Sequence, residues 1–221
     1  MKVQARAKIN LALDVVERMD NGYHSLDMIM APISICDEIE IEIGICDEVT
    51  CEGMKLPEKN TVSKMVQVLK ELYHLSSNYK ISIKKHIPAQ AGLGGGSADA
   101  AAVCKAILQM EGIEETEENL YEITKQVGQM CLSASMTSGQ ESRVLGKKSF
   151  RLKVIGSFNI IVVKPDFGIS TANAFSKWKE SRPFHPDVDL VESSIREKNM
   201  DLLYQTMANA LEQSHLRLSL N

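Results

Sequence analysis

The glycine-rich segment at residues 92–96 constrains this chain more than any other feature, because it separates a strand pattern from a helix pattern. Before it, Ile81 and Ile83 alternate with polar residues over 80–86, which predicts a strand that Pro88 ends. Behind it, residues 98–108 are rich in alanine and favour a helix. Glycine permits positive φ and a close ligand, and a helix N-terminus favours anions. The segment therefore predicts a phosphate-binding loop.

A flexible connector is the alternative interpretation of this segment. However, the segment has no polar linker residues and leads directly into the helix pattern. A Walker A loop is excluded because no lysine follows the glycines. A dinucleotide-binding turn is excluded because Pro88 and the start of the helix leave no Gly-x-Gly-x-x-Gly turn, and no acidic residue ends a following strand.

Composition limits the class of protein. The 221 residues suit one domain or two small ones, and 44% hydrophobic residues are ample for a packed core. A net charge of −4 without a basic stripe argues against a nucleic-acid partner. No apolar run reaches the ~18 residues of a membrane span, and the N-terminus has no signal-peptide core, so we expect a cytoplasmic chain without membrane contact. The five cysteines form no Cys-x-x-Cys pair, which predicts reduced, mostly buried thiols.

Periodicity predicts an α+β fold in which helices lie on one side of a mixed sheet. Residues 3–9 and 11–16 favour an extended strand, and residues 38–45 alternate so strictly that one face is isoleucine and the other glutamate. These glutamates are interpreted as solvated, with a metal role as the alternative. Residues 60–72 and 114–127 are predicted helices, and the apolar stripe of the first is expected in the core: Val62, Met65, Val66, Leu69 and Leu72.

The second half of the chain is less regular. Residues 158–163 predict a buried strand, and Ser170 or Thr171 is expected to cap a helix that carries Phe175 and Trp178. Two short helices are predicted at 187–196 and 199–211. Polar and basic residues between 146 and 156 suggest a domain junction, which gives domains at 1–150 and 151–221.

Near the N-terminus, Lys8 and Asn10 flank an apolar residue at a strand end, and Tyr23 and His24 follow a turn signal at 20–22. This combination would suit a polar substrate that carries a flat ring. A plain surface hairpin is the alternative, and these residues alone do not decide between the two.

Four segments taken together resemble the GHMP small-molecule kinases, and within them a branch that acts on a cytidyl diphosphate compound. The segments are AKINL at 7–11, DNGYHSL at 20–26, the stretch from Ile87-Pro88 through GLGGGSADAA at 92–101, and the stretch from Lys164-Pro165 through STA at 170–172. The similarity runs from about residue 3 to residue 211.

The resemblance implies a two-domain GHMP fold and an ATP-dependent kinase that phosphorylates the 2-hydroxyl of a cytidyl diphosphate derivative of methylerythritol, a step of the non-mevalonate route to isoprenoid precursors. Mg²⁺ is the implied metal, and a monomer or homodimer is expected. Ser97 with Glu111 or Glu141 could reach the metal, but no ligand set is singled out.

The resemblance also assigns roles to individual residues. Lys8 lies beside the substrate hydroxyl as the catalytic lysine, and Asn10 holds the methylerythritol. Tyr23 and Phe175 sandwich cytosine, and His24 contacts its polar edge. The positions expected to bind ATP are Asn60 at the adenine, together with Pro88, Gly92, Gly94, Gly95, Gly96 and Ser97 around the phosphates, with Ala98 and Asp99 opening the helix.

Two departures from the family pattern stand out. Met130 occupies the position of the aspartate that accepts the proton of the attacking hydroxyl, and a thioether cannot act as a base; Lys147 and Lys148 replace a usual glycine–glutamate pair. The chain also stops at Asn221, before the family's second glycine-rich loop, so we expect an incomplete second domain with exposed apolar surface. A catalytically impaired paralogue that binds nucleotide as a sensor or partner protein, and a kinase with a shifted substrate, are therefore the alternatives.

Overall fold

The computed structural model describes residues 1–20, 24–128, 142–145, 148–151, 159–178 and 184–212. The chain forms two compact units, each built from segments that are separate in sequence. Unit 1 comprises residues 1–8, 33–89 and 93–138, and unit 2 comprises residues 9–32, 90–92 and 139–221. The predicted domains at 1–150 and 151–221 are continuous in sequence, unlike these two units, and they stay a prediction.

Unit 1 contains a mixed sheet with the strand order β3-β4-β2-β1. The strands are β1 (Lys2–Arg18), β2 (His24–Gly44), β3 (Glu48–Cys51) and β4 (Asn78–Lys84), of which β1 and β2 continue into unit 2. β4 runs antiparallel to β2, with Ile41 opposite Ile81, and parallel to β3. The alternation at 38–45 therefore predicted the antiparallel strand correctly, although the strand ends at Gly44.

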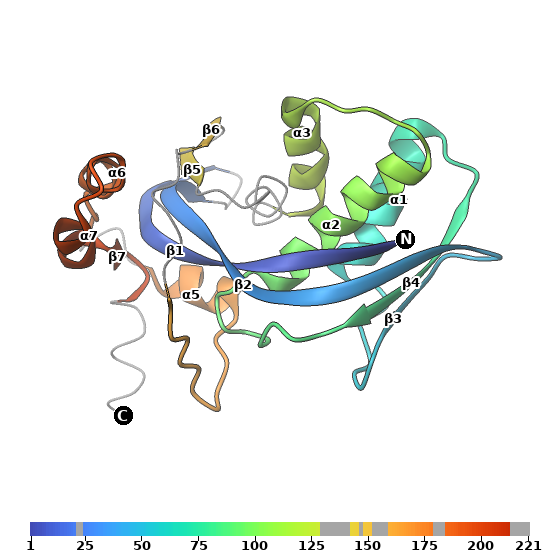
Figure 1. The fold of residues 1–221 in the computed structure, drawn as a ribbon, viewed down its shortest axis with the longest axis horizontal. Helices are drawn as coiled ribbons and strands as arrows, with labels where there is room; N and C mark the ends of the chain where they lie inside the picture. Colours follow the sequence, from blue (N-terminus) through green and yellow to red (C-terminus); the bar gives the residue numbers. More distant parts are fainter. Residues whose placement is uncertain (21–23, 129–141, 146–147, 152–158, 179–183, 213–221) are drawn as a thin grey trace. The chain divides into compact units, whose positions relative to one another are not determined.

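Three helices cover one face of this sheet: α1 (Thr61–Tyr73), α2 (Gly95–Met110) and α3 (Glu117–Val127) (Figure 1). Ile39 and Ile41 of β2 pack against them in the main core of unit 1. The predicted α+β fold with helices on one side is confirmed. The prediction that Leu72 lies in the core is wrong, because Leu72 is 48% exposed. The other four apolar residues of its stripe are buried.

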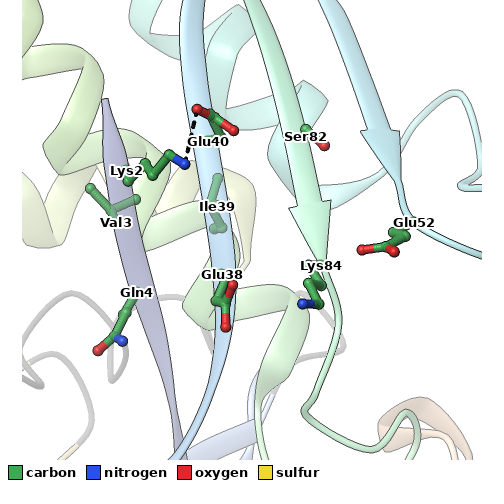
Figure 2. A pocket seen from close by; sticks show the side chains of 9 residues that line it. All are labelled: Lys2, Val3, Gln4, Glu38, Ile39, Glu40, Glu52, Ser82 and Lys84. Carbon is green, nitrogen blue, oxygen red and sulfur yellow. Dashed lines mark ion pairs between the residues drawn. The ribbon is translucent and has the colours of Figure 1, made fainter.

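The other face of the sheet in unit 1 is polar, as expected for the solvated glutamates. A pocket of about 610 Å³ lies there, and Figure 2 shows the side chains from β1, β2 and β4 and of Glu52 that line it. Glu40 pairs with Lys2 at 3.5 Å. Among the described residues, no three His, Cys, Asp or Glu side chains are placed to hold a metal ion. The metal alternative for these glutamates therefore has no support.

Unit 2 adds short elements to the other halves of β1 and β2. β7 (Ala208–Asn209) pairs parallel with β1, and β5 (Ser142–Leu145) pairs antiparallel with both β2 and β6 (Lys148–Arg151). Its helices are α5 (Thr171–Lys177), α6 (Val188–Arg196) and α7 (Met200–Thr206). Ser170 caps α5 as predicted, because its hydroxyl accepts a hydrogen bond from the Asn173 N–H at 3.1 Å.

Two predictions for unit 2 are wrong. Residues 159–163 form no strand, and Ile161 and Val163 are 91% and 86% exposed. An apolar run becomes a strand only where a neighbouring strand takes its hydrogen bonds, and none of the described strands pairs with it. The helix predicted to reach residue 211 ends at Thr206, and the next residues form β7. The expected exposed apolar surface is present at residues 160–163 and at Phe167.

The cysteines also differ from expectation. Of the four described, only Cys104 is buried; Cys36 and Cys51 are partly buried and Cys46 is exposed. All four are free thiols. Across the part of the chain that the structure describes, no helix is long and apolar enough to cross a membrane.

Candidate active site

The glycine loop leads into helix α2, which starts within the loop at Gly95 and not at Ala98 as predicted. Gly94 is the N-cap with φ +74°, a conformation that glycine adopts without the cost paid by other residues. No side chain caps this end. The first N–H groups of an α-helix have no partner within the helix. This N-terminus therefore offers amide donors and a positive dipole end to an anion.

Lys8 lies against this loop from strand β1. Its backbone N–H donates to the Leu93 carbonyl at 3.0 Å. A Cβ at position 94 would lie 3.3 Å from Cε of Lys8, so the lysine side chain runs directly along Gly94. Lys8 is only 3% exposed, and this burial lowers its pKa to about 8. The structure thus brings the predicted catalytic lysine and the predicted phosphate loop together.

The start of helix α1 meets the same loop. The Thr61 hydroxyl donates to the Gly96 carbonyl at 2.7 Å. Asn60 is the N-cap of α1: its Oδ1 accepts from the backbone of Val62 and Ser63, and its Nδ2 donates to the Pro57 carbonyl. Asn60 also lines a depression of about 660 Å³ beside α1. Its observed role is helix capping, and its predicted contact with adenine stays a prediction.

A buried charge cluster, defined here as Asp37, Lys85 and Asp99, lies beneath the loop. The Lys85 ammonium donates to Oδ2 of Asp37 and to Oδ2 of Asp99, the latter at 2.8 Å. Oδ1 of Asp37 accepts the backbone N–H groups of His86 and Ile87 at 2.6 and 2.8 Å. Oδ1 of Asp99 is buried and has no hydrogen-bond partner among the described residues. The sequence analysis missed this cluster; the available signal was a carboxylate inside an alanine-rich helix.

The residues predicted to bind cytosine lie in unit 2. His24, at the start of β2, stacks on Phe175 of α5 with ring centroids 5.2 Å apart and an angle of 22° between the planes. Trp178 meets the His24 ring edge-on at 5.5 Å. The structure therefore brings His24 and Phe175 together and adds Trp178, which the sequence analysis treated only as part of a helix. Tyr23 lies outside the described residues, and Asn10 lies on β1 in the same unit.

Of the two carboxylates predicted to reach a metal, only Glu111 is among the described residues. Glu111 follows the last residue of α2, and a 16-residue helix spans about 24 Å, so it lies far from the glycine loop. Its carboxylate instead accepts a hydrogen bond from the Tyr79 hydroxyl at 2.6 Å. Glu141 and Met130 lie outside the described residues. The described residues therefore give no ligand set for Mg²⁺.

Comparison with known proteins places this arrangement in a family. The GHMP kinases N terminal domain matches residues 60–139, which include the glycine loop. A 4-diphosphocytidyl-2-C-methyl-D-erythritol kinase of Clostridium botulinum is 35% identical over 96% of this chain and 77% of its own length. The chain belongs to the 4-diphosphocytidyl-2-C-methyl-D-erythritol kinase family. The Acetivibrio thermocellus relative of the same name is 38% identical over 96% of this chain and 76% of its own length.

Solved structures show the fold of this family member independently. The crystal structure of a 4-(cytidine 5'-diphospho)-2C-methyl-D-erythritol kinase superposes with a TM-score of 0.71 at 22% identity, over 99% of this chain and 78% of that one. Streptococcus pneumoniae phosphomevalonate kinase, solved with phosphomevalonate and AMPPNP, gives 0.70 at 10% identity, over 94% and 77%. The GHMP kinase fold expected from the sequence is confirmed.

Proposed function

We propose that this chain is an ATP-dependent kinase that phosphorylates the 2-hydroxyl of 4-diphosphocytidyl-2-C-methyl-D-erythritol in the non-mevalonate pathway. The observation that carries the proposal is the buried Lys8 against the uncapped N-terminus of α2, in a chain of this kinase family. A coupled assay of ADP release with the cytidyl substrate tests it. ADP release that depends on this substrate is the expected result, and its absence would contradict the proposal.

The residues around the loop suit a triphosphate. Phosphoryl transfer depends mostly on positioning and charge neutralisation. Gly92, Gly94, Gly95, Gly96 and Ser97 are proposed to hold the phosphates, with Pro88 shaping the loop and Asn60 near the adenine. Because no side chain among the described residues caps the start of α2, its amide donors are proposed to bind phosphate oxygens. Lys8 then supplies a positive charge beside the transferred group. Mg²⁺ is part of the proposal through the family, and no residue is assigned to it.

The buried ammonium of Lys8 is expected to destabilise the fold. Its pKa near 8 means that the buried ammonium destabilises the fold below about pH 8, and this cost disappears as the pH rises toward the usual lysine value. We expect Lys8→Met to abolish turnover and to raise the free energy of unfolding at neutral pH by up to about 3 kcal/mol. Denaturant unfolding at neutral and alkaline pH measures this, and the gain should shrink at the higher pH.

A Lys8→Met variant that turns over substrate like the original chain would contradict the catalytic role of Lys8. A variant that is less stable at neutral pH would contradict the predicted destabilising effect of the buried ammonium, and would leave the catalytic role untouched. Lys164→Met is the matched control: the Lys164 ammonium donates to the neighbouring Pro165 carbonyl at 2.8 Å in an exposed position, and its removal should change neither quantity.

The cytosine end of the substrate is proposed to bind Tyr23, His24 and Phe175, with Asn10 at the methylerythritol. Stacking of a base on an aromatic ring contributes about 1–3 kcal/mol. We therefore expect Phe175→Ala to weaken CDP binding by about tenfold or more and to leave ADP binding unchanged. Trp178 is the only tryptophan in the chain and contacts His24, so its fluorescence should report CDP binding directly.

Phe167→Ala is the control for this experiment, because Phe167 is an aromatic residue of the same unit and is 62% exposed. It should bind CDP normally. Equal losses of CDP and ADP affinity in Phe175→Ala would show that the ring does not belong to a separate cytidyl site.

A nucleotide-binding paralogue without kinase activity is the second candidate function, and Met130 at the position of the family aspartate favours it. General-base help contributes about 10²–10⁴ in rate, so its loss slows a kinase without removing the binding sites. ADP and CDP binding without measurable turnover would support this candidate. A shifted substrate is disfavoured by the His24–Phe175 pair, which suits a flat base.

A further inference from the structure

The buried charge cluster of Asp37, Lys85 and Asp99 joins the two ends of the glycine loop. Lys85 follows β4 and precedes the loop, whereas Asp99 lies on α2 behind it, and their ion pair of 2.8 Å connects the two. Asp37 holds the start of the same loop through Lys85 and through the N–H groups of His86 and Ile87. The span between β4 and the start of α2 is therefore set by this cluster.

The cluster also touches the loop at Gly95. A Cβ at this position would lie 3.1 Å from Cγ2 of Ile87 and 3.2 Å from Nζ of Lys85. The ammonium that Asp99 holds is therefore packed directly beneath the first residue of α2. A change in the position of Lys85 would move the backbone whose amides are proposed to bind phosphate.

The charges in the cluster do not balance. Two carboxylates share one ammonium, and both carboxylates are almost fully buried, at 0% and 3% exposure for Asp37 and Asp99. The partner-free oxygen belongs to Asp99. Burial, reinforced by Asp37 and opposed by Lys85, raises the pKa of Asp99 to about 7. For Asp37, burial acts in the same direction, but hydrogen bonds from Ile87, Lys85 and His86 outweigh it and hold the pKa below its usual value. Asp99 is thus the member of the cluster that takes up a proton near neutral pH.

We propose that Asp99 is a positioning residue of the phosphate loop, acting through Lys85, and that binding of a nucleotide phosphate is coupled to uptake of one proton by its free oxygen. This rests on the proposed function, because the anion concerned is the nucleotide of that kinase. A bound phosphate adds negative charge near a cluster that already carries an excess carboxylate, and a proton on Oδ1 of Asp99 removes that repulsion.

Other titratable groups surround the cluster and enter the design of the test. Cys51 at the end of β3 interacts electrostatically with all three groups of the cluster and with Glu52, and burial raises the pKa of the Cys51 thiol, which therefore stays uncharged near neutral pH. His86 is the next residue after Lys85 and pairs with Glu38 at 3.4 Å. Because these groups and ADP itself are the same in wild type and variant, their titration cancels in the ratio of the two affinities.

The test is ADP binding by calorimetry to the whole chain and to Asp99→Asn. Asparagine can still accept the hydrogen bond from Lys85, but it never ionises. At about pH 6 the two proteins should bind ADP equally, and at about pH 8 the wild type should bind about three- to tenfold more weakly than Asp99→Asn, a tenfold loss corresponding to one pH unit of coupling. Asp99→Ala, which cannot hold Lys85, should bind ADP at least about tenfold more weakly than Asp99→Asn at both pH values.

The matched control is Glu111→Gln, which removes a carboxylate hydrogen-bonded to Tyr79 at the opposite end of α2. It should follow the wild-type pH profile. A ratio of wild-type to Asp99→Asn affinity that is the same at both pH values would overturn the coupling, and equal affinities of Asp99→Ala and Asp99→Asn would overturn the positioning role. Failure of the wild type to bind ADP at any pH would overturn the proposed function together with this inference.

Discussion

Replacing Met130 by aspartate is expected to raise turnover of the cytidyl substrate by about 10²–10⁴, the usual contribution of a general base. Met130 occupies the position of the family's catalytic aspartate in the sequence resemblance, and a thioether cannot accept the proton of the attacking hydroxyl. Lys8, the proposed catalytic lysine, lies against the glycine loop, and no described side chain caps the start of α2. Initial rates of ADP release, at saturating ATP, measure the gain.

Met130→Asn is the matched control for this variant. Asparagine has nearly the same size and polarity as aspartate but cannot act as a base, so it should leave turnover unchanged. A gain in both variants would point to a polar or steric effect and not to base catalysis. No gain in Met130→Asp, in protein that is folded and binds both ADP and CDP, would favour the nucleotide-binding paralogue.

Gly95→Val is expected to weaken ADP binding by at least about a hundredfold, or about 2.8 kcal/mol. Even a Cβ at this position would be 3.1–3.3 Å from Ile87 and from Nζ of Lys85, which is closer than ordinary contact. The branched side chain must therefore displace Lys85 or the backbone of the loop, and either change spoils the geometry of the amides. The overpacking should also cost about 1–3 kcal/mol of stability.

Gly112→Ala controls for the loss of a glycine and for lower stability. Gly112 follows the other end of α2, has φ +68°, and has open space around the position of a Cβ. Alanine there should cost about 1 kcal/mol of stability through backbone strain and leave ADP binding unchanged. Unfolding curves identify which variants remain folded at the assay temperature. If folded Gly95→Val binds ADP with the original affinity, the phosphate site does not lie at this loop.

Gly95→Val and Met130→Asp separate nucleotide binding from the chemical step. Gly95→Val removes the proposed nucleotide site and should abolish both binding and turnover, whereas Met130→Asp changes only the chemical step. A chain that binds ADP through Gly95 but gains nothing from the aspartate is a nucleotide-binding protein. A chain that shows both effects is a kinase that lacks one catalytic group.

The sequence was sufficient to predict those strands, helix starts and loops that depend on residues close together in the chain. The alternation of Ile39 and Ile41 with glutamates predicted the half-buried strand, because side chains on a strand alternate between its two faces. Ser170 was predicted at a helix start because its side chain can bond to an N–H group three residues away, whereas the capping role of Asn60 was seen only in the structure. The glycine loop was also predicted from adjacent residues, because its glycines lie between a strand pattern and a helix pattern, although the helix begins within the loop at Gly95.

The family also followed from the sequence, because its motifs are short runs of adjacent residues such as GLGGGSADAA and DNGYHSL. The comparisons confirm the family and the fold. The individual roles of the site residues remain predictions, since they concern ligands and not the chain's own contacts.

Only the tertiary structure decided the features that join distant parts of the chain. Lys85 meets Asp37 across 48 residues, His24 stacks on Phe175, and neither contact is visible in any local pattern. Residues 159–163 have the composition of a buried strand, but their backbone has no pairing partner among the described strands and their side chains stay exposed. A strand and a buried charge both need partners from elsewhere in the chain, because an unpaired polar group is costly away from water. The sequence therefore determined the local elements and the family, and tertiary packing determined the burial of Lys8 and the charge cluster beneath the phosphate loop.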